Sequence, residues 1–337
     1  MDSLTQAVLG AAIGEAGFRH TLGGRAVVFG AICGTLPDLD VIVGGVDPWL
    51  YLLHHRGVTH SLLTLPVAAV PIGALAAKLS GVGRPRDWMA CAFWALVTHP
   101  LLDVFTAYGT QLLAPLSDQR FAIDGVSIID PVYTVPLVVA TALAATRHRR
   151  LSRAVAAGAL AWGLLWLGLG LGLTARAKAQ GLARLQAEGV EVRRLRAMPG
   201  FGTHFVHRVV AERADGGLSI TQTSALVDGD GPVVHLEPAR GPEVELARAH
   251  PNVQLFSWFA DGYLNTGLVA DSTGADVTFD DLRYGRLLDP AAPLWRARAR
   301  VEGGAVVDVT REDAVRGGLG PELDAQWRLL WTGRVRP

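Results

Sequence analysis

The chain begins with a series of apolar segments and ends with short stretches in which apolar and polar residues alternate. A helix needs roughly 20 mostly apolar residues to cross the hydrocarbon layer of a bilayer. The first apolar segment is too short and polar to cross alone, and we expect its neighbours to bury it. The pattern predicts an all-α polytopic membrane domain of about six helices, over residues 4–18, 26–45, 61–81, 88–107, 131–146 and 154–175.

A different pattern follows. A helix is expected over residues 176–188, and the later stretches alternate between Gly, Pro and Asp residues, which is typical of antiparallel strands. Examples are HFVHRVVAE, GLSITQTSAL, VQLFSWF and ADVTFDDLRYG. We therefore expect a helical membrane domain with a metal site over residues 1–175 and a β-rich extramembrane domain over residues 176–337. The histidines of the second domain lack the spacing of metal ligands: His204, His207, His235 and His250.

Composition supports a membrane protein, because only 18% of the residues are charged and soluble proteins average about 25%. The formal net charge of zero gives no electrostatic reason to expect nucleic acid as a partner. Cys33 and Cys91 both lie in apolar runs and are interpreted as packing residues.

Basic residues in the short connections predict the orientation, because Lys and Arg accumulate on the cytoplasmic side. Successive connections alternate between the two sides of the membrane, and the connections on one side hold two arginines, Arg56 and Arg120. The other set holds eight: Arg19, Arg25, Arg84, Arg86, Arg147, Arg149, Arg150 and Arg153. This bias predicts a multi-pass protein, with residues 46–60, residues 108–130 and the C-terminal domain on the extracytoplasmic side.

Ionisable side chains are unfavourable at membrane depth, so each needs an explanation. By the predicted topology, four clusters lie on the outer face of the membrane: PDLD (37–40), HHRGVTHS (54–61), HPLLD (99–103) and FAIDGVSIIDP (121–131). Each alone has a simpler explanation, such as a helix stop, an interfacial loop or a His–Asp hydrogen bond. Their gathering on one face predicts a single site. Glu15 lies too deep for it, and we expect it to pair with Arg19 or Arg25 or to line a polar cavity.

The spacings within the clusters are those of a metal site. His99 and Asp103 are four positions apart, on one helix face, and Asp38 and Asp40 would point the same way in extended chain after Pro37. Imidazole and carboxylate without thiolate suit Zn²⁺, with Mn²⁺ or Fe²⁺ as alternatives. The predicted metal ligands are Asp38, Asp40, His55, His60, His99 and Asp103.

Three residues have predicted catalytic roles. Asp38 and His60 would act as further ligands or as the base. Arg56 would clamp an anionic oxygen, such as that of a phosphate. The alternative for Arg56 is an ion pair with a nearby carboxylate, for which Asp38 and Asp130 are the candidates.

These motifs resemble those of the YdjM-like inner-membrane metal-dependent hydrolases over roughly residues 1–150. The resemblance rests on LPDLD (36–40), HRGVTHS (55–61), HPLLDVFTAYGTQLLAP (99–115) and IIDPVYT (128–134). It implies a hydrolase of unsettled substrate, located in a bacterial inner (cytoplasmic) membrane. The layout is also distantly similar to that of zinc-dependent phospholipase C. In this chain, Asp40, His55, His99 and Asp103 would match the zinc ligands of that enzyme. Many family members have a His near the N-terminus where this chain has Gln6, which implies fewer metals or one that is held weakly.

The leading hypothesis is a membrane-bound metal-dependent hydrolase that cleaves a phosphoester in a lipid-like substrate. The alternative is a non-enzymatic protein in which the same cluster binds metal for sensing, transport or scaffolding. A transporter would place polar groups at mid-membrane on several helices, and a scaffold would have a closed ligand set.

The basic-residue bias makes the topology testable with alkaline phosphatase fusions, which are active only outside the cytoplasm. Fusions after Arg176 should be active, and fusions within residues 147–153 should be inactive. The reverse pattern would place the site in the cytoplasm and contradict the predicted orientation.

Overall fold

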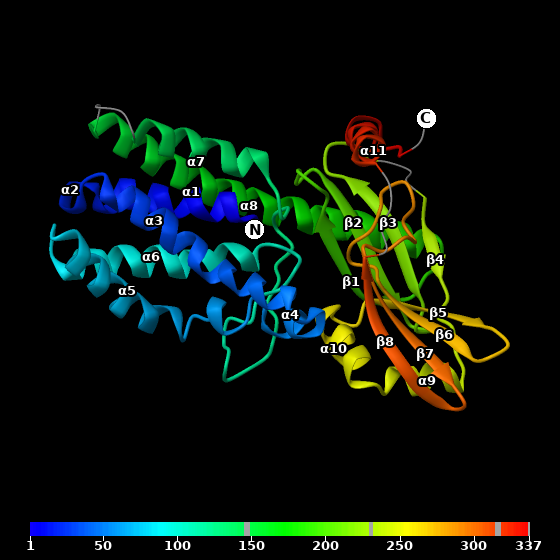
Figure 1. The fold of residues 1–337 in the computed structure, drawn as a ribbon. Helices are drawn as coiled ribbons and strands as arrows, with labels where there is room; N and C mark the ends of the chain where they lie inside the picture. Colours follow the sequence, from blue (N-terminus) through cyan, green and yellow to red (C-terminus); the bar gives the residue numbers. More distant parts are fainter. Residues whose placement is uncertain (145–148, 229–231, 314–317, 336–337) are drawn as a thin grey trace. The chain divides into compact units, whose positions relative to one another are not determined.

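The computed structural model describes residues 1–144, 149–228, 232–313 and 318–335. The chain divides into two compact units (Figure 1). The N-terminal unit comprises Met1–Val46, His54–Leu171 and Phe201–Thr203. The C-terminal unit comprises Asp47–Leu53, Gly172–Gly200 and His204–Pro337. The predicted boundary between residues 175 and 176 falls inside one continuous helix, and the division into two domains there stays a prediction.

Helices make up the N-terminal unit, where α1 packs against α3 and α5 packs against α6. The Asp2 carboxylate caps α1 by accepting a hydrogen bond from the Thr5 backbone N–H. Gly81 ends α5 in the left-handed conformation, with φ 64°. The helices of residues 1–187 are α1 (Ser3–Ile13), the π-helix η1 (Gly14–Phe18), α2 (Arg19–Leu22), α3 (Arg25–Thr35), the 3₁₀ helix η2 (Leu36–Gly45), α4 (Pro48–His54), the 3₁₀ helix η3 (Val58–His60), α5 (Leu65–Ser80), α6 (Pro85–Val104), α7 (Pro131–Ala144) and α8 (Arg149–Ala187). Most of α4 and the end of α8 belong to the C-terminal unit.

The helical character of this unit is confirmed, but the structure does not support about six membrane helices. Among the described residues, two segments are long and apolar enough to cross a membrane, Arg25–Val43 and Arg150–Ala187. A third is possible if Pro48–His60 and Leu65–Ser80, which are bent by 68°, form one span. Helices α1, α5 and α7 have 11, 16 and 14 residues, short of the roughly 20 that a span needs. Helix α6 has 20 residues but carries Arg86, Asp87, His99 and Asp103.

One boundary also differs from the prediction, and another is not tested. The helix expected over residues 176–188 is the end of α8, which continues without a break from the apolar stretch before it. Residue 146, where the fifth segment was expected to end, and Arg147 of the basic connection lie outside the described residues.

Helices α1 and α3 approach so closely that only glycine fits between them. A Cβ atom added at Gly10 or at Gly30 would lie 2.1 Å from the carbonyl oxygen of the other residue. One added at Gly34 would lie 2.4 Å from the Gln6 carbonyl oxygen. Small residues at such crossings allow two backbones to pack tightly where lipid provides no hydrophobic driving force. The contact places Gln6 beside the end of α3.

The C-terminal unit contains two four-stranded antiparallel sheets, which confirms the predicted β-rich region. The first has the order β1 (Val192–Pro199), β2 (Val206–Arg213), β3 (Leu218–Ser224) and β4 (Val234–Leu236). The second has the order β5 (Leu264–Ala270), β6 (Ala275–Asp281), β7 (Trp295–Glu302) and β8 (Ala305–Asp313). The remaining helices are α9 (Pro242–Arg248), α10 (Pro251–Phe259) and α11 (Leu319–Thr332).

The stretch VQLFSWF (253–259) was expected to be a strand and forms α10 instead. Pro251 occupies the first turn, where its missing N–H costs no hydrogen bond. The His250 side chain caps the helix by accepting from the Asn252 backbone N–H. Val253, Phe256 and Phe259 recur every third residue and are buried, a spacing that fits a helix face as well as the alternation fitted a strand.

The glycine contact between α1 and α3 predicts that added methyl groups destabilise the helical unit. Gly10→Ala or Gly30→Ala should lower the free energy of unfolding by roughly 1–3 kcal/mol, the usual effect of overpacking. Thermal unfolding in detergent measures it. Gly168→Ala in α8 is the matched control, because a Cβ there meets nothing within 4 Å. Equal melting temperatures for all three variants would contradict this account of the packing.

Candidate metal centre

Four side chains from three segments of the N-terminal unit meet in its interior. Asp38 lies in η2 just after Pro37, His60 ends η3, and His99 and Asp103 lie one turn apart on α6. Their ligand atoms all lie within 4.8 Å of one another, as those of a metal-binding group do. His60, His99 and Asp103 are fully buried, and the side chain of Asp38 is 11% exposed.

The distances within the group are short and regular. The Nε2 atoms of His60 and His99 lie 3.0 Å apart. Asp38 Oδ1 lies 3.5 Å from the first and 3.3 Å from the second of these nitrogens. Asp103 Oδ2 lies 3.4 Å from the first and 3.5 Å from the second. Two imidazole nitrogens and two carboxylate oxygens thus surround one point.

The far side of each imidazole ring is held by the protein. His99 Nδ1 lies 2.6 Å from the Gly34 carbonyl oxygen, to which it must donate. His60 Nδ1 lies 3.3 Å from Asp40 Oδ2 and 3.0 Å from Thr59 Oγ1. A ring that donates through Nδ1 directs the lone pair of Nε2 to the opposite side. Both lone pairs therefore face the centre, where a cation can accept them.

Asp103 provides the test of whether a cation fits. Its Oδ2 is buried and, among the described residues, has no hydrogen-bond partner. Buried polar atoms without a partner are rare in native proteins and indicate an ion or a water. A divalent cation at the centre would bind this oxygen. It would also remove the repulsion between the lone pairs of the two imidazole nitrogens, which face each other.

The other oxygen of Asp103 is held by cationic and amide groups. Arg56 Nη2 lies 3.3 Å from Oδ1, Gln6 Nε2 donates to it at 3.2 Å, and the Met1 amino group forms an ion pair with it. Arg56 also donates to Thr106 Oγ1 at 2.8 Å, and its guanidinium lies 4.8 Å from the centroid of the Tyr108 ring. The carboxylate that Arg56 contacts is therefore Asp103, whereas the alternative of an ion pair had named Asp38 and Asp130 as candidates.

Asp40 and His55, two further predicted ligands, lie beside the group of four. Asp40 Oδ1 lies 2.7 Å from His55 Nδ1. Its Oδ2 accepts from the Arg56 backbone N–H at 3.0 Å and from Thr59 Oγ1 at 2.7 Å. Asp40 thus organises the loop that carries Arg56 and His60. Arg56 adopts φ 60°, an uncommon conformation for a residue other than glycine.

Three other residues contribute to the site: Ser3 and Gly34 were missed, and Gln6 was singled out only through the resemblance to the family. Gln6 donates to the His99 carbonyl oxygen at 3.2 Å as well as to Asp103. Ser3 Oγ donates to Asp38 Oδ2 at 3.0 Å, and the Gly34 carbonyl orients His99. The sequence signal for Gln6 was a polar side chain inside an apolar segment. The Gly34 carbonyl left no signal in the sequence.

Glu15 and Asp130, two other acidic residues of the helical unit, have structural partners. Glu15 pairs with Arg19 at 2.6 Å, as predicted, and accepts from Ser152 Oγ at 2.7 Å. Asp130 accepts from the Tyr133 backbone N–H at the start of α7, and from Trp166 Nε1. Asp124 is buried, with φ 61°.

The histidines of the C-terminal unit do not form a second metal group among the described residues. His204 and His207 are buried, and burial lowers the pKa of His207 to about 3, so it stays neutral. His235 lies 2.8 Å from Ser219 Oγ and 3.1 Å from Glu188 Oε2.

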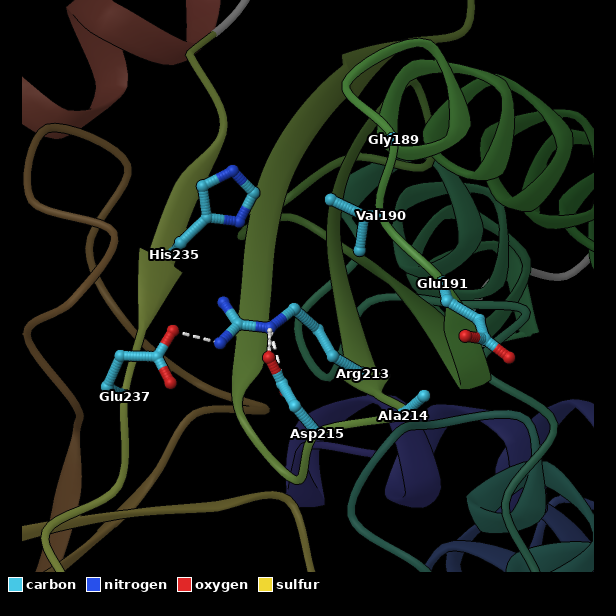
Figure 2. Close-up of a pocket in the computed structure, with 8 residues that line it drawn as sticks. All are labelled: Gly189, Val190, Glu191, Arg213, Ala214, Asp215, His235 and Glu237. Atoms are coloured by element: carbon cyan, nitrogen blue, oxygen red, sulfur yellow. Dashed lines mark hydrogen bonds and ion pairs between the residues drawn. The ribbon is translucent and has the colours of Figure 1, made fainter.

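A hollow of about 490 Å³ lies in the C-terminal unit (Figure 2). Arg213 projects into its middle, where its Nε donates to Asp215 Oδ1 at 3.0 Å and its Nη2 pairs with Glu237. The Arg213 guanidinium already has two carboxylate partners, so it is poorly placed to bind a further ligand. The hollow is therefore a weaker candidate for a functional site than the buried Asp/His group.

Comparison with known proteins agrees with the membrane character of the helical unit. Residues 1–179 match the family model described as YdjM inner membrane protein. A protein of Bacillus subtilis (strain 168) named "Uncharacterized protein YfhP" is 29% identical over 153 residues, which cover 42% of this chain and 46% of that protein. The match thus spans about half the length of this curated relative. No solved structure matches the chain.

The geometry predicts that the group of four binds metal as a unit. His99→Gln removes the imidazole nitrogen and Asp103→Asn removes the negative charge of the carboxylate, and each should strip most of the metal from the purified protein. Elemental analysis measures metal per chain. His250→Ala is the control, because His250 caps α10 in the other unit. Full metal content in His99→Gln would reduce His99 and Asp103 to a hydrogen-bonded pair on a helix.

Proposed function

Because the chain belongs to the YdjM inner membrane protein family, we propose that it is a membrane-bound, metal-dependent hydrolase whose substrate is a phosphoester in a lipid-like molecule. The observation that carries the proposal is the buried group of two imidazoles and two carboxylates around one point. Costly polar groups inside a membrane protein are a signature of function.

The proposed metal ligands are Asp38, His60, His99 and Asp103. Asp40 and His55 contact each other beside this group, and Asp40 also holds the loop that carries His60. Nitrogen and oxygen donors without thiolate favour Zn²⁺, and Mn²⁺ or Fe²⁺ are alternatives. When bound, a divalent cation would supply Lewis acidity, which polarises a phosphoryl oxygen and makes water more acidic.

The protein groups have separable tasks in this proposal. Asp38 is the one member of the group with solvent exposure, so substrate and water would reach the group from its side. Its carboxylate can accept a proton from the attacking water, with Ser3 holding the second oxygen. His60 can bind the metal through Nε2, because Asp40 and Thr59 fix its ring on the Nδ1 side.

Arg56 supports the phosphoester assignment, since a guanidinium matches the oxygens of phosphate. It is buried, and one of its faces is bound to Asp103 and Thr106. Its Nε has no hydrogen-bond partner among the described residues, which leaves a donor for a substrate anion. Apolar helices around the group make a lipid-like substrate the natural choice, and the predicted outer location would place the reaction on the extracytoplasmic side.

A second candidate is a non-enzymatic metal site that senses or transports metal or stabilises a scaffold. The observation in its favour is that four protein ligands already complete a tetrahedral zinc site, whereas catalytic zinc has three and an open position. The absorption of Co²⁺-substituted protein separates the two candidates. Weak bands indicate five or six ligands with room for substrate, and the strong bands of a tetrahedral site would favour the closed set.

Activity itself is tested with metal-loaded protein in lipid vesicles. Release of headgroup or phosphate from phospholipid, or hydrolysis of a simple phosphodiester, should require the metal and be lost in His60→Gln. Full metal occupancy with no hydrolysis of any phosphoester would favour the second candidate.

Arg56→Lys distinguishes a substrate-binding role from a structural one. If Arg56 holds substrate, the variant should bind metal normally but lose about 2 kcal/mol or more in kcat/KM, since Lys cannot form the bidentate contact. If Arg56 serves only to hold Asp103, metal occupancy or melting temperature should fall instead. Full activity together with full stability would contradict both roles.

A further inference from the structure

Helix α11 has an apolar face that no described residue covers. Its inner face packs Ala325 and Leu329 against Val206 and Val335. On the opposite face Leu323, Trp327 and Trp331 are 42%, 61% and 54% exposed. Four-residue spacing aligns the three along the helix, and the two indole rings lie 5.6 Å apart. A contiguous exposed apolar patch that contains two tryptophans indicates that this face binds a partner.

The location of α11 within the C-terminal unit identifies the partner. The helix packs on the start of β2, at Val206, and Ser224 Oγ at the end of β3 donates to the Leu330 carbonyl oxygen. The next residue of β2, His207, lies 3.2 Å from Thr174 Oγ1 on α8. Thr174 is in the last turn of the apolar stretch of α8. Helix α11 therefore covers the end of the sheet at which α8 changes from apolar to polar (Figure 1).

Other exposed residues at this end of the first sheet are apolar or basic. Leu226, just beyond β3, is 43% exposed. Arg176 on α8 reaches Asp228 at 3.4 Å, so the loop after β3 lies beside the same turn of α8. Arg328 lies on α11 itself, where it pairs with Asp324, and Arg334 lies just after the helix. Tryptophan with basic neighbours is the composition of segments at the level of lipid headgroups.

We propose that α11 lies on the bilayer surface, with Leu323, Trp327 and Trp331 inserted at the level of the headgroups. The helix would anchor the C-terminal unit to the membrane that α8 crosses. The proposal depends on α8 spanning the membrane and is independent of the metal site and of its chemistry.

Fluorescence quenching in reconstituted full-length protein tests the proposal. The protein is placed in phosphatidylcholine–phosphatidylglycerol vesicles, with acyl chains either unmodified or brominated close to the headgroup. The signal of wild type minus that of Trp327→Phe/Trp331→Phe isolates the two indoles. Brominated lipid should remove the larger part of this difference signal, and iodide in the water should remove little.

Trp295→Phe is the control, because its ring packs on Phe259 and Tyr284 beside the second sheet. Its difference signal should not respond to brominated lipid. Circular dichroism melting checks that the Phe variants keep their fold. A difference signal quenched by iodide and not by lipid would show a water-exposed face, and one quenched by neither would show a face covered by protein. Either result would overturn the proposal.

Discussion

A carboxylate in the interior of the helical unit is the constraint on which the rest of the site depends. Asp103 is fully buried, and an uncompensated buried charge destabilises a protein by several kcal/mol. One of its oxygens is compensated by Arg56, Gln6 and the Met1 amino group. The other faces His60 and His99, where a cation would compensate it. The loop before η3, the start of α1 and the end of α6 must therefore be in place together.

Helix packing and site chemistry are connected through the glycines of α1 and α3. Their close approach brings the Gln6 backbone to Gly34, and the Gly34 carbonyl is the group that orients His99. A larger residue at the crossing would move both the donor to Asp103 and the acceptor from His99. The tight contact can thus be understood as part of the site as well as part of the core.

The sequence predicted those parts of the site that local geometry determines. His99 and Asp103 come together because four residues make about one helical turn, and Arg19 reaches Glu15 for the same reason. Asp40 was expected to point with Asp38 in extended chain, but the segment is a 3₁₀ helix, so Asp40 faces His55 and Thr59 instead. Gln6 and Gly34 contact residues 97 and 65 positions away, and no local pattern encodes such pairs. Helices α3 and α5 are shorter than the predicted segments, because apolar residues continue beyond the ends of each helix.

The most direct test of the metal centre is X-ray absorption spectroscopy of the purified wild-type protein, together with its metal content. The account predicts about one divalent metal ion per chain, with a first shell of nitrogen and oxygen and the scattering pattern of two imidazoles. Absence of metal above background, or a shell that contains sulfur from Cys33 or Cys91, would contradict it.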